Sequence, residues 1–267
     1  AVTLASGMAK AGKKPVVAIY SSFLQRAYDQ IIHDVCIPEL PVTFAIDRAG
    51  IVGGDGETHQ GIFDLSFLRI IPNLIIMAPR DENCLQHMLY TAVNSGKPAV
   101  VRYPRGEIIG IEMDEELKRL EPGKAELLRE GEDLLILAVG SMVYPALEAA
   151  KLLEEEAVKA GVMDPCFIKP LDEDFILKEL ARYKNILIVE EQVLAGGFGS
   201  AVLELVNEHK ITDLNIKRMG LPDHFIEHGS QSLLRDLYSL NARGIKTAGL
   251  ELLQKKRNDK LEVSYGH

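Results

Sequence analysis

A regular alternation of short apolar runs with helical patterns is the feature that most constrains the fold of this chain. Residues 16–20 (Val-Val-Ala-Ile-Tyr) are typical of a buried strand, and Leu24, Ile31 and Val35 follow at helical spacing. The same order recurs, with further strands predicted at 42–46, 74–77, 99–102, 134–139, 166–168, 186–190 and 214–218. Strands that alternate with helices need right-handed crossovers, so we predict largely parallel sheets covered on both faces.

Residues 106–126 interrupt this alternation with a polar, turn-rich segment. The chain has 267 residues, 47% of them hydrophobic, and a single core rarely grows beyond ~250–300 residues. We therefore predict two three-layer α/β domains, residues 1–107 and 127–267, joined by a linker over 108–126. The strand at 166–168 is assigned to the second domain, whose helices are expected to begin near residues 143, 172, 199 and 230.

Charge and hydropathy exclude several classes of protein. The formal net charge is −9 and no basic block is present, whereas a nucleic-acid-binding surface needs a basic face. No apolar run approaches the ~20 residues that span a bilayer. Cys36, Cys84 and Cys166 are scattered without a CxxC spacing, which favours reduced, buried thiols over a disulfide frame or a zinc site. We expect a cytoplasmic protein that binds neither nucleic acid nor membranes.

The first residues form an amphipathic helical pattern, without the strand that usually begins an α/β domain. We therefore expect the first domain to be incomplete at its N-terminus. Either the chain is cut there, or it is one half of a split enzyme.

Three segments contain candidate functional residues, and the first of them is 20–30. It lies where a predicted strand ends and a helix begins, which is where open α/β sheets bind ligands. Backbone N–H groups at a helix start attract anions, and Arg26 adds a guanidinium that can bind a phosphate through two hydrogen bonds. The alternative is a solvated Arg26 beside aromatic residues, Tyr20 and Phe23, that are buried for packing.

The second segment, 47–61, has five glycines among fifteen residues, which lets the backbone wrap closely around a ligand. Asp55 and His59 place a carboxylate and an imidazole four residues apart. Such a pair can orient a substrate hydroxyl and transfer a proton near neutral pH. A surface turn is the alternative, and a metal site would need a third ligand that is not nearby.

The third segment, 101–106, follows the last predicted strand of the first domain. Arg105 could supply a second phosphate-binding guanidinium opposite Arg26, or it could be an arginine at a domain interface. Two other patterns are weaker. Residues 196–199 (Gly-Gly-Phe-Gly) fit a dinucleotide loop poorly and favour a strand–helix turn. His224 and His228 have the i, i+4 spacing of a metal pair, but they follow Leu-Pro-Asp at a loop–helix junction, so no metal site is predicted.

Taken together, these motifs resemble a known family. They are the runs 18–30, 47–61, 102–106, 169–172 and 220–223. The chain resembles the pyrimidine-binding and C-terminal domains of the 1-deoxy-D-xylulose-5-phosphate synthase family, a branch of the transketolase-like thiamine-diphosphate enzymes. The Phe-Leu-Gln-Arg-Ala-Tyr-Asp-Gln run and the Asp-Gly-x-Thr-His-Gln-Gly loop distinguish this branch from transketolase proper.

The resemblance implies a reaction and a set of substrate contacts. Pyruvate condenses with D-glyceraldehyde 3-phosphate, CO2 is released, and the product feeds isoprenoid, thiamine and pyridoxal synthesis. Tyr20, Arg26 and Arg105 are implied to hold the triose phosphate, and Arg48 to contact this acceptor more loosely.

The resemblance also implies catalytic and cofactor contacts. Phe23 packs against the aminopyrimidine ring of thiamine diphosphate, while Asp55 and His59 hydrogen-bond the reacting groups, with His59 handling the proton. In relatives, the glutamate that activates the cofactor lies in a Glu-Gln-His segment just ahead of an Ala-Val-Thr run, and here Ala1-Val2-Thr3 comes first. The ligands of the diphosphate and of Mg²⁺ are likewise expected outside this chain.

The sequence is therefore interpreted as the C-terminal part of such a synthase. It is expected to be inactive without its N-terminal domain, whether that domain belongs to the same or a separate chain, and to work as a homodimer. Two alternatives stay open. One is a subunit of another transketolase-like enzyme, either a split transketolase or a 2-oxoacid dehydrogenase E1 β. The other is a non-catalytic dimerisation module.

Overall fold

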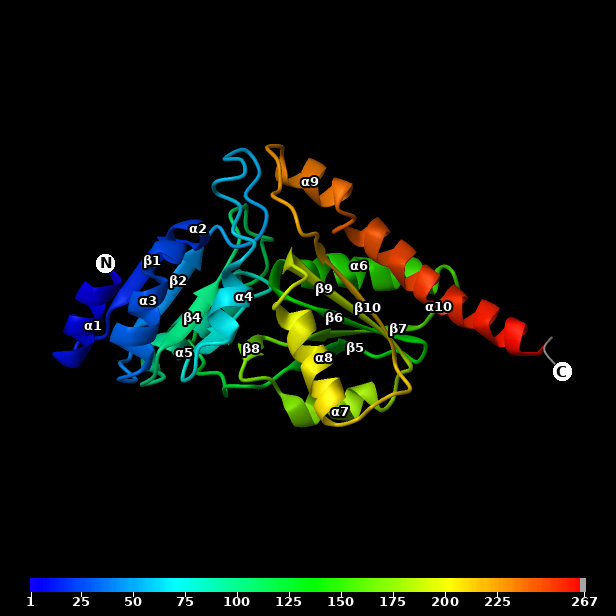
Figure 1. Ribbon diagram of the computed structural model, residues 1–267, viewed down its shortest axis with the longest axis horizontal. Coiled ribbons are helices and arrows are strands. Elements are labelled where there is room, and N and C mark those ends of the chain that lie inside the picture. Colours follow the sequence, from blue (N-terminus) through cyan, green and yellow to red (C-terminus); the bar gives the residue numbers. More distant parts are fainter. Residues whose placement is uncertain (265–267) are drawn as a thin grey trace.

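The computed structural model describes residues 1–264, with side chains described through residue 254. Two five-stranded sheets lie next to each other, each flanked by helices (Figure 1). The first has the strand order β1-β2-β4-β3-β8 and the second β10-β9-β6-β7-β5. Neighbouring strands are parallel, except that β8 runs antiparallel to β3 and β5 antiparallel to β7. The predicted α/β class with two largely parallel sheets is confirmed.

The first sheet contains β1 (Val16–Tyr20), β2 (Thr43–Asp47), β3 (Ile75–Met77), β4 (Ala99–Arg102) and β8 (Phe167–Lys169). Its helical elements are α1 (Val2–Lys10), α2 (Ser21–Leu24), η1 (Gln25–Ala27), α3 (Tyr28–Gln30), η2 (Ile31–Cys36), α4 (Asp64–Arg69) and α5 (Glu82–Asn94). The helix predicted after β1 is present as the consecutive turns of α2, η1, α3 and η2. Its apolar positions Leu24, Ile31 and Val35 are fully buried, as the helical spacing predicted.

The second sheet contains β5 (Glu126–Arg129), β6 (Leu134–Ala138), β7 (Ala160–Asp164), β9 (Asn185–Val193) and β10 (Asn215–Leu221). Its helical elements are η3 (Gly140–Met142), α6 (Val143–Glu154), α7 (Glu173–Leu180), α8 (Phe198–Glu208), α9 (Gln231–Leu237) and α10 (Ala242–Ser264). Side-chain caps fix the N-termini of α7 and α9. Asp172 accepts a hydrogen bond from the Phe175 N–H, and Ser230 accepts one from the Leu233 N–H. β5 and β7 were not predicted from the sequence. β5 is short and amphipathic, and β7 contains Gly161, so neither has a strong strand signal.

The assignment of residues 166–168 to the second sheet was wrong. β8 crosses back and pairs with β3, with Phe167 opposite Met77 and Lys169 opposite Ile76. The Lys169 ammonium also donates hydrogen bonds to the carbonyls of Arg69 and Ile71, at 3.0 and 2.5 Å. A three-residue apolar run has no period that selects a sheet, and the unpaired edge of β3 supplies the backbone partners.

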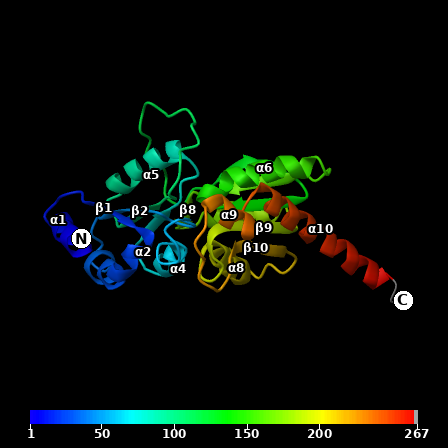
Figure 2. The same cartoon turned by 90° about the horizontal axis from the view of Figure 1, so that it is seen from above.

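The two halves of the chain, before and after residues 107–125, share a large apolar contact. Leu68 of α4, Leu135 of β6 and Phe198 of α8 belong to one buried cluster that spans both sheets. Residues 107–125 form no regular element and run along α5 (Figure 2). There Glu82 accepts hydrogen bonds from the N–H groups of Gly110 and Ile111, at 2.6 and 2.9 Å. Among the described helices, none combines the length and the apolar character needed to cross a bilayer.

Candidate functional site

The side chains that the sequence singled out gather at the carboxyl ends of β1, β2 and β4. They are Tyr20, Phe23, Arg26, Arg48, Asp55, His59 and Arg105. Tyr20 ends β1 and lies opposite Asp47 at the end of β2, while Arg105 lies just beyond β4. Because parallel strands end at one edge of their sheet, residues far apart in the sequence meet there.

Arg48 is the centre of this cluster. Its guanidinium lies 4.1 Å from the centre of the Tyr20 ring and donates to the Tyr20 hydroxyl at 2.9 Å. It also forms an ion pair with Asp55 at 2.9 Å. The bond to Tyr20 raises the pKa of Arg48, and the negative charge of Asp55 adds to this effect, so the group stays charged. Arg105 reaches the same Asp55 oxygen at 3.4 Å with half of its side chain exposed. Asp55 therefore bridges two cations that an incoming phosphate could also bind.

An aromatic surface lies beside these charges. Tyr20 and Phe23 are stacked with their ring centres 5.2 Å apart, and the His59 ring meets Phe23 edge to face at 5.3 Å. Arg26 lies 5.9 Å from the centre of the Phe23 ring. Phe23 is 39% exposed, so its ring offers an apolar plane to a ligand. Such a plane can stack on a heteroaromatic ring.

The glycine-rich loop that holds Asp55 and His59 is closed at its base. Gly50 and Gly61 exchange backbone hydrogen bonds of 2.7 and 2.8 Å. Gly50 has φ +81°, and a Cβ on Gly61 would lie 2.8 Å from the Ser21 Cβ, so both positions require glycine. The base is buried, whereas residues 54–58 are exposed or half-buried. The loop therefore presents its polar tip from a fixed stem.

Two residues of the second half contact this loop and were not predicted from the sequence. Glu191 is buried and accepts a hydrogen bond from the Ile51 N–H at 2.6 Å. Gln231 donates to the carbonyls of Ile51 and Arg105, at 2.7 and 2.8 Å. No local pattern could have found them, because these contacts join residues separated by more than a hundred positions.

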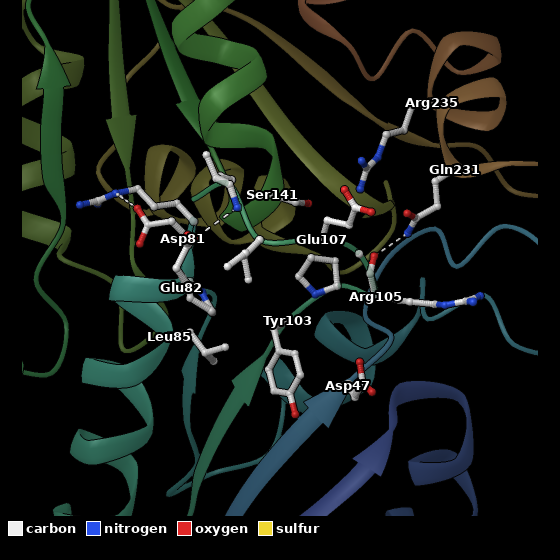
Figure 3. Close-up of a pocket in the computed structure, with 16 residues that line it drawn as sticks. Asp47, Asp81, Glu82, Leu85, Tyr103, Arg105, Glu107, Ser141, Gln231 and Arg235 are labelled. Atoms are coloured by element: carbon white, nitrogen blue, oxygen red, sulfur yellow. Dashed lines mark hydrogen bonds and ion pairs between the residues drawn. The ribbon is translucent and has the colours of Figure 1, made fainter. Parts of the chain in front are cut away.

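A cavity of about 530 Å³ lies next to Arg105 between the two halves. Figure 3 shows Tyr103 of the first half across from Ser141 and Arg235 of the second. Burial raises the pKa of Tyr103, and the nearby charge of Asp47 raises it further, so its hydroxyl stays protonated near neutral pH. The cavity therefore borders the site with polar groups from both halves.

The two weaker sequence patterns have structural explanations. The backbone N–H groups of Phe198 and Gly199, which begin α8, both bond to the Glu190 carboxylate at 2.8 Å. The position where a nucleotide phosphate would bind is thus taken by a side chain of the same chain, and the segment is a strand–helix turn as predicted. His224 lies 3.0 Å from the Tyr238 hydroxyl. Within the described residues, no group of three or more His, Cys, Asp and Glu side chains could hold a metal.

Comparison with known proteins follows the same division of the chain. Residues 1–109 match a family model for the transketolase pyrimidine-binding domain, and residues 123–245 match one for the transketolase C-terminal domain. The chain is 57% identical over 256 residues to the 1-deoxy-D-xylulose-5-phosphate synthase of Halothermothrix orenii, covering 96% of this chain and 40% of that protein. It is 55% identical over 262 residues to the synthase of Syntrophus aciditrophicus, covering 98% and 40%. The chain therefore spans about two-fifths of the length of these relatives.

Solved structures agree on the fold. A split-gene transketolase, described as an inactive beta4 tetramer, superposes with a TM-score of 0.85 at 30% identity, covering 94% of this chain and 80% of that one. A transketolase from Pichia stipitis gives a TM-score of 0.70 at 22% identity, and covers 92% of this chain and 35% of that one.

Proposed function

This chain belongs to the transketolase family, whose pyrimidine-binding and C-terminal domains it contains, and we propose that it forms the acceptor side of a 1-deoxy-D-xylulose-5-phosphate synthase. The complete enzyme would condense pyruvate with D-glyceraldehyde 3-phosphate and release CO2. One observation supports this most strongly. The aromatic plane of Phe23, the guanidinium groups of Arg48 and Arg105, and the acid–base candidates Asp55 and His59 lie in one continuous cluster.

The residues present fit the organic part of thiamine diphosphate. Phe23 exposes one ring that can pack against the aminopyrimidine. When bound, the cofactor supplies the carbanion that attacks the keto carbon of pyruvate and accepts the electrons released with CO2. We propose that the diphosphate and Mg²⁺ are held by the family's diphosphate-binding domain, and that the activating glutamate comes from the Glu-Gln-His segment that precedes the Ala-Val-Thr run in relatives. The chain is then expected to work only together with an N-terminal part that contains both that domain and that segment.

The arginines are proposed to bind the triose phosphate. A phosphate offers several acceptor oxygens, and it would compete with Asp55 for Arg48 and Arg105. Arg26 lies over the Phe23 ring, 5.9 Å from its centre, and the Tyr20 hydroxyl accepts a hydrogen bond from Arg48. Binding would thereby release the Asp55 carboxylate to accept a hydrogen bond from a substrate hydroxyl.

His59 is proposed to transfer the proton of the condensation step. As the new carbon–carbon bond forms, the aldehyde oxygen of the acceptor gains negative charge and needs a proton. His59 lies against Phe23, where the acceptor meets the cofactor ring, and Thr58 lies 2.9 Å from its Nδ1. An imidazole in this place can give that proton and take it back near neutral pH.

The test is reconstitution. The chain should release CO2 from pyruvate, dependent on triose phosphate, when it is mixed with or fused to the N-terminal part of a relative, which contains the diphosphate-binding domain and the Glu-Gln-His segment. Alone it should release none, and strong activity of the isolated chain would contradict the division of the site. The chain's likeness to the split-gene transketolase supports a second candidate, a transketolase subunit. A preference for sugar-phosphate donors over pyruvate would favour that candidate.

We further propose that the complete enzyme is a cytoplasmic homodimer, because the family resemblance implies that state. Sedimentation of the reconstituted enzyme tests the assembly. If it contains one copy of the chain and retains full activity, the homodimer is not needed for the reaction.

A further inference from the structure

We propose that Gln231 and Glu191, both in the second half of the chain, are positioning residues for the reaction in the first half. They would fix the stem of the 50–61 loop and the backbone of Arg105, and so set the distance between Asp55 and its arginine partners. The kinetic part of this inference rests on the proposed function. The structural part, that the second half holds the loop in place, does not.

Gln231 joins two separate loops of the site. The two hydrogens of its amide are both used, one on the Ile51 carbonyl at 2.7 Å and one on the Arg105 carbonyl at 2.8 Å. Figure 3 shows the side chain of Gln231 pointing from α9 to the Arg105 backbone. One side chain therefore fixes the distance between the stem that leads to Asp55 and the stem that carries Arg105.

Glu191 holds the same loop from a second direction. One of its oxygens accepts the Ile51 N–H at 2.6 Å, and the other accepts from Ser141 at 3.2 Å and from Arg235 at 3.0 Å. The residue is 1% exposed, so the Arg235 guanidinium is what balances its charge. The N–H and the carbonyl of Ile51 are thus both bound by the second half.

The glycines of the loop agree with this close approach. A Cβ on Gly50 would lie 2.7 Å from the Glu191 oxygen, and a Cβ on Gly53 would lie 3.0 Å from the Gln231 backbone nitrogen. Both glycines have positive φ, +81° and +87°. The loop backbone is therefore shaped to receive these two residues, in addition to being flexible enough for a ligand.

The chemistry explains why such support matters. The tip of the loop is exposed and rich in glycine, so the positions of Asp55 and His59 depend in part on how the stem is held. Displacement of a reacting group by ~1 Å can lower a rate by ~10²-fold. Asp55 meets Arg105 at 3.4 Å, the longer of its two ion pairs, and both partners of that pair depend on backbone that Gln231 binds. Acceptor binding is accordingly the step we expect to suffer.

The first experiment measures amide hydrogen exchange in Gln231→Met, which keeps the side-chain length and removes both donors. Gln254→Met, at an exposed position of α10, is the matched control. We expect the amides of residues 51–61 to exchange at least about ten-fold faster in Gln231→Met alone, with strand β9 unchanged in both variants. Equal protection of the loop in the two variants would overturn the inference. This readout needs no activity.

The second experiment uses the chain together with the N-terminal part of a relative, as in the reconstitution. Gln231→Met should raise the KM for the triose phosphate about ten-fold and leave the KM for pyruvate within about two-fold. Equal losses for both substrates would indicate a general structural role and refute the positioning role. Glu191→Gln, which leaves the Ile51 contact possible and unpairs Arg235, should give a smaller rise with the same selectivity. If the wild-type pair shows no synthase activity, the proposed function fails, while the exchange result still decides the structural part.

Discussion

Two glycine-rich segments of this chain each follow a strand, but one forms a closed structural turn and the other an exposed loop. The segment after β9, residues 194–199, closes on itself, because the Glu190 carboxylate accepts the N–H groups of Phe198 and Gly199 that begin α8. The segment after β2, residues 50–61, carries exposed polar groups at its tip. A high density of glycines thus indicates that another group approaches the backbone closely. In a structural turn that group is a side chain of the same chain, as Glu190 is here, whereas in a binding site it is a ligand.

The arginines that contact the two segments differ in the same way. Arg218 donates to the Leu194 carbonyl at 2.7 Å and to Ser200 at 3.2 Å, so it stabilises the closed turn. Arg48 and Arg105 instead share Asp55 at the surface, where a ligand could replace that carboxylate. A cation bound to backbone supports the fold, whereas cations paired at the surface can exchange their partner for a substrate.

The largest expected effect concerns the open loop. His59→Ala, in the chain supplied with the N-terminal part of a relative, should lower kcat by ~10²- to 10⁴-fold, because general acid–base groups contribute that much. The thermal unfolding midpoint should not change, since the ring is partly exposed. His209→Ala, at the exposed end of α8, is the control and should change neither quantity. An unaltered kcat in His59→Ala would remove the main functional difference between the two segments.

The next effect compares one arginine that contacts each segment, Arg105 for the open loop and Arg218 for the closed turn. Arg105→Ala should raise the KM for the triose phosphate by ~10-fold or more, because a hydrogen bond to a charged group contributes about 1.5–3 kcal/mol. Arg218→Ala should leave that KM unchanged and lower the stability, since the half-buried Leu194 carbonyl and Ser200 hydroxyl lose the hydrogen bonds that Arg218 donates. Steady-state kinetics and urea unfolding measure the two outcomes. A reversed pattern would mean that the closed and open segments have been assigned the wrong way round.

A third comparison concerns the glycines themselves. A Cβ on Gly197 would lie 2.9 Å from the Glu190 Cδ, whereas no atom lies within 4 Å of a Cβ on Gly54. Gly197→Ala should therefore cost about 1–3 kcal/mol of stability, the usual range for overpacking a buried site. Gly54→Ala should change the free energy of unfolding by less than about 1 kcal/mol. Similar losses in urea titrations of the two variants would contradict the distinction.

The smallest effect is a pH dependence in the closed segment. Burial raises the pKa of Glu190 above its ordinary value of 4.5, although the N–H groups of Gly199 and Phe198 act in the opposite direction. The folded protein therefore binds this proton more tightly than the unfolded chain does. Stability from this group is full below pH 4.5 and falls as the pH rises through the folded-state pKa.

Glu190→Gln keeps the shape of the side chain and cannot titrate. The stability of the wild type relative to this variant should therefore decrease in thermal unfolding as the pH is raised above 4.5. Glu208→Gln, at an exposed position of α8, is the matched control. A difference that stays constant or grows with pH would show that burial does not dominate at Glu190.

The sequence predicted the class of fold, and the same physical reason explains why the candidate residues lie together in the structure. The alternation of strand and helix patterns requires parallel strands, and parallel strands bring Tyr20, Arg48 and Arg105 to one edge. The helices expected to begin near residues 172 and 230 are present, and in the structure a local side chain caps each of them. These features depend on neighbours in the chain, and a local pattern encodes them.

Other features had no local signal. The apolar run 166–168, which overlaps β8, gave no indication that it would pair with β3, and Glu191 gave none that it would bind Ile51, 140 positions earlier. Both contacts arise only when the two sheets pack together and leave backbone groups that need partners. The sequence by itself thus determined two α/β units and a cluster of candidate residues at strand ends. The tertiary structure decided which glycine-rich segment is open, because that depends on which buried carboxylate reaches which backbone N–H.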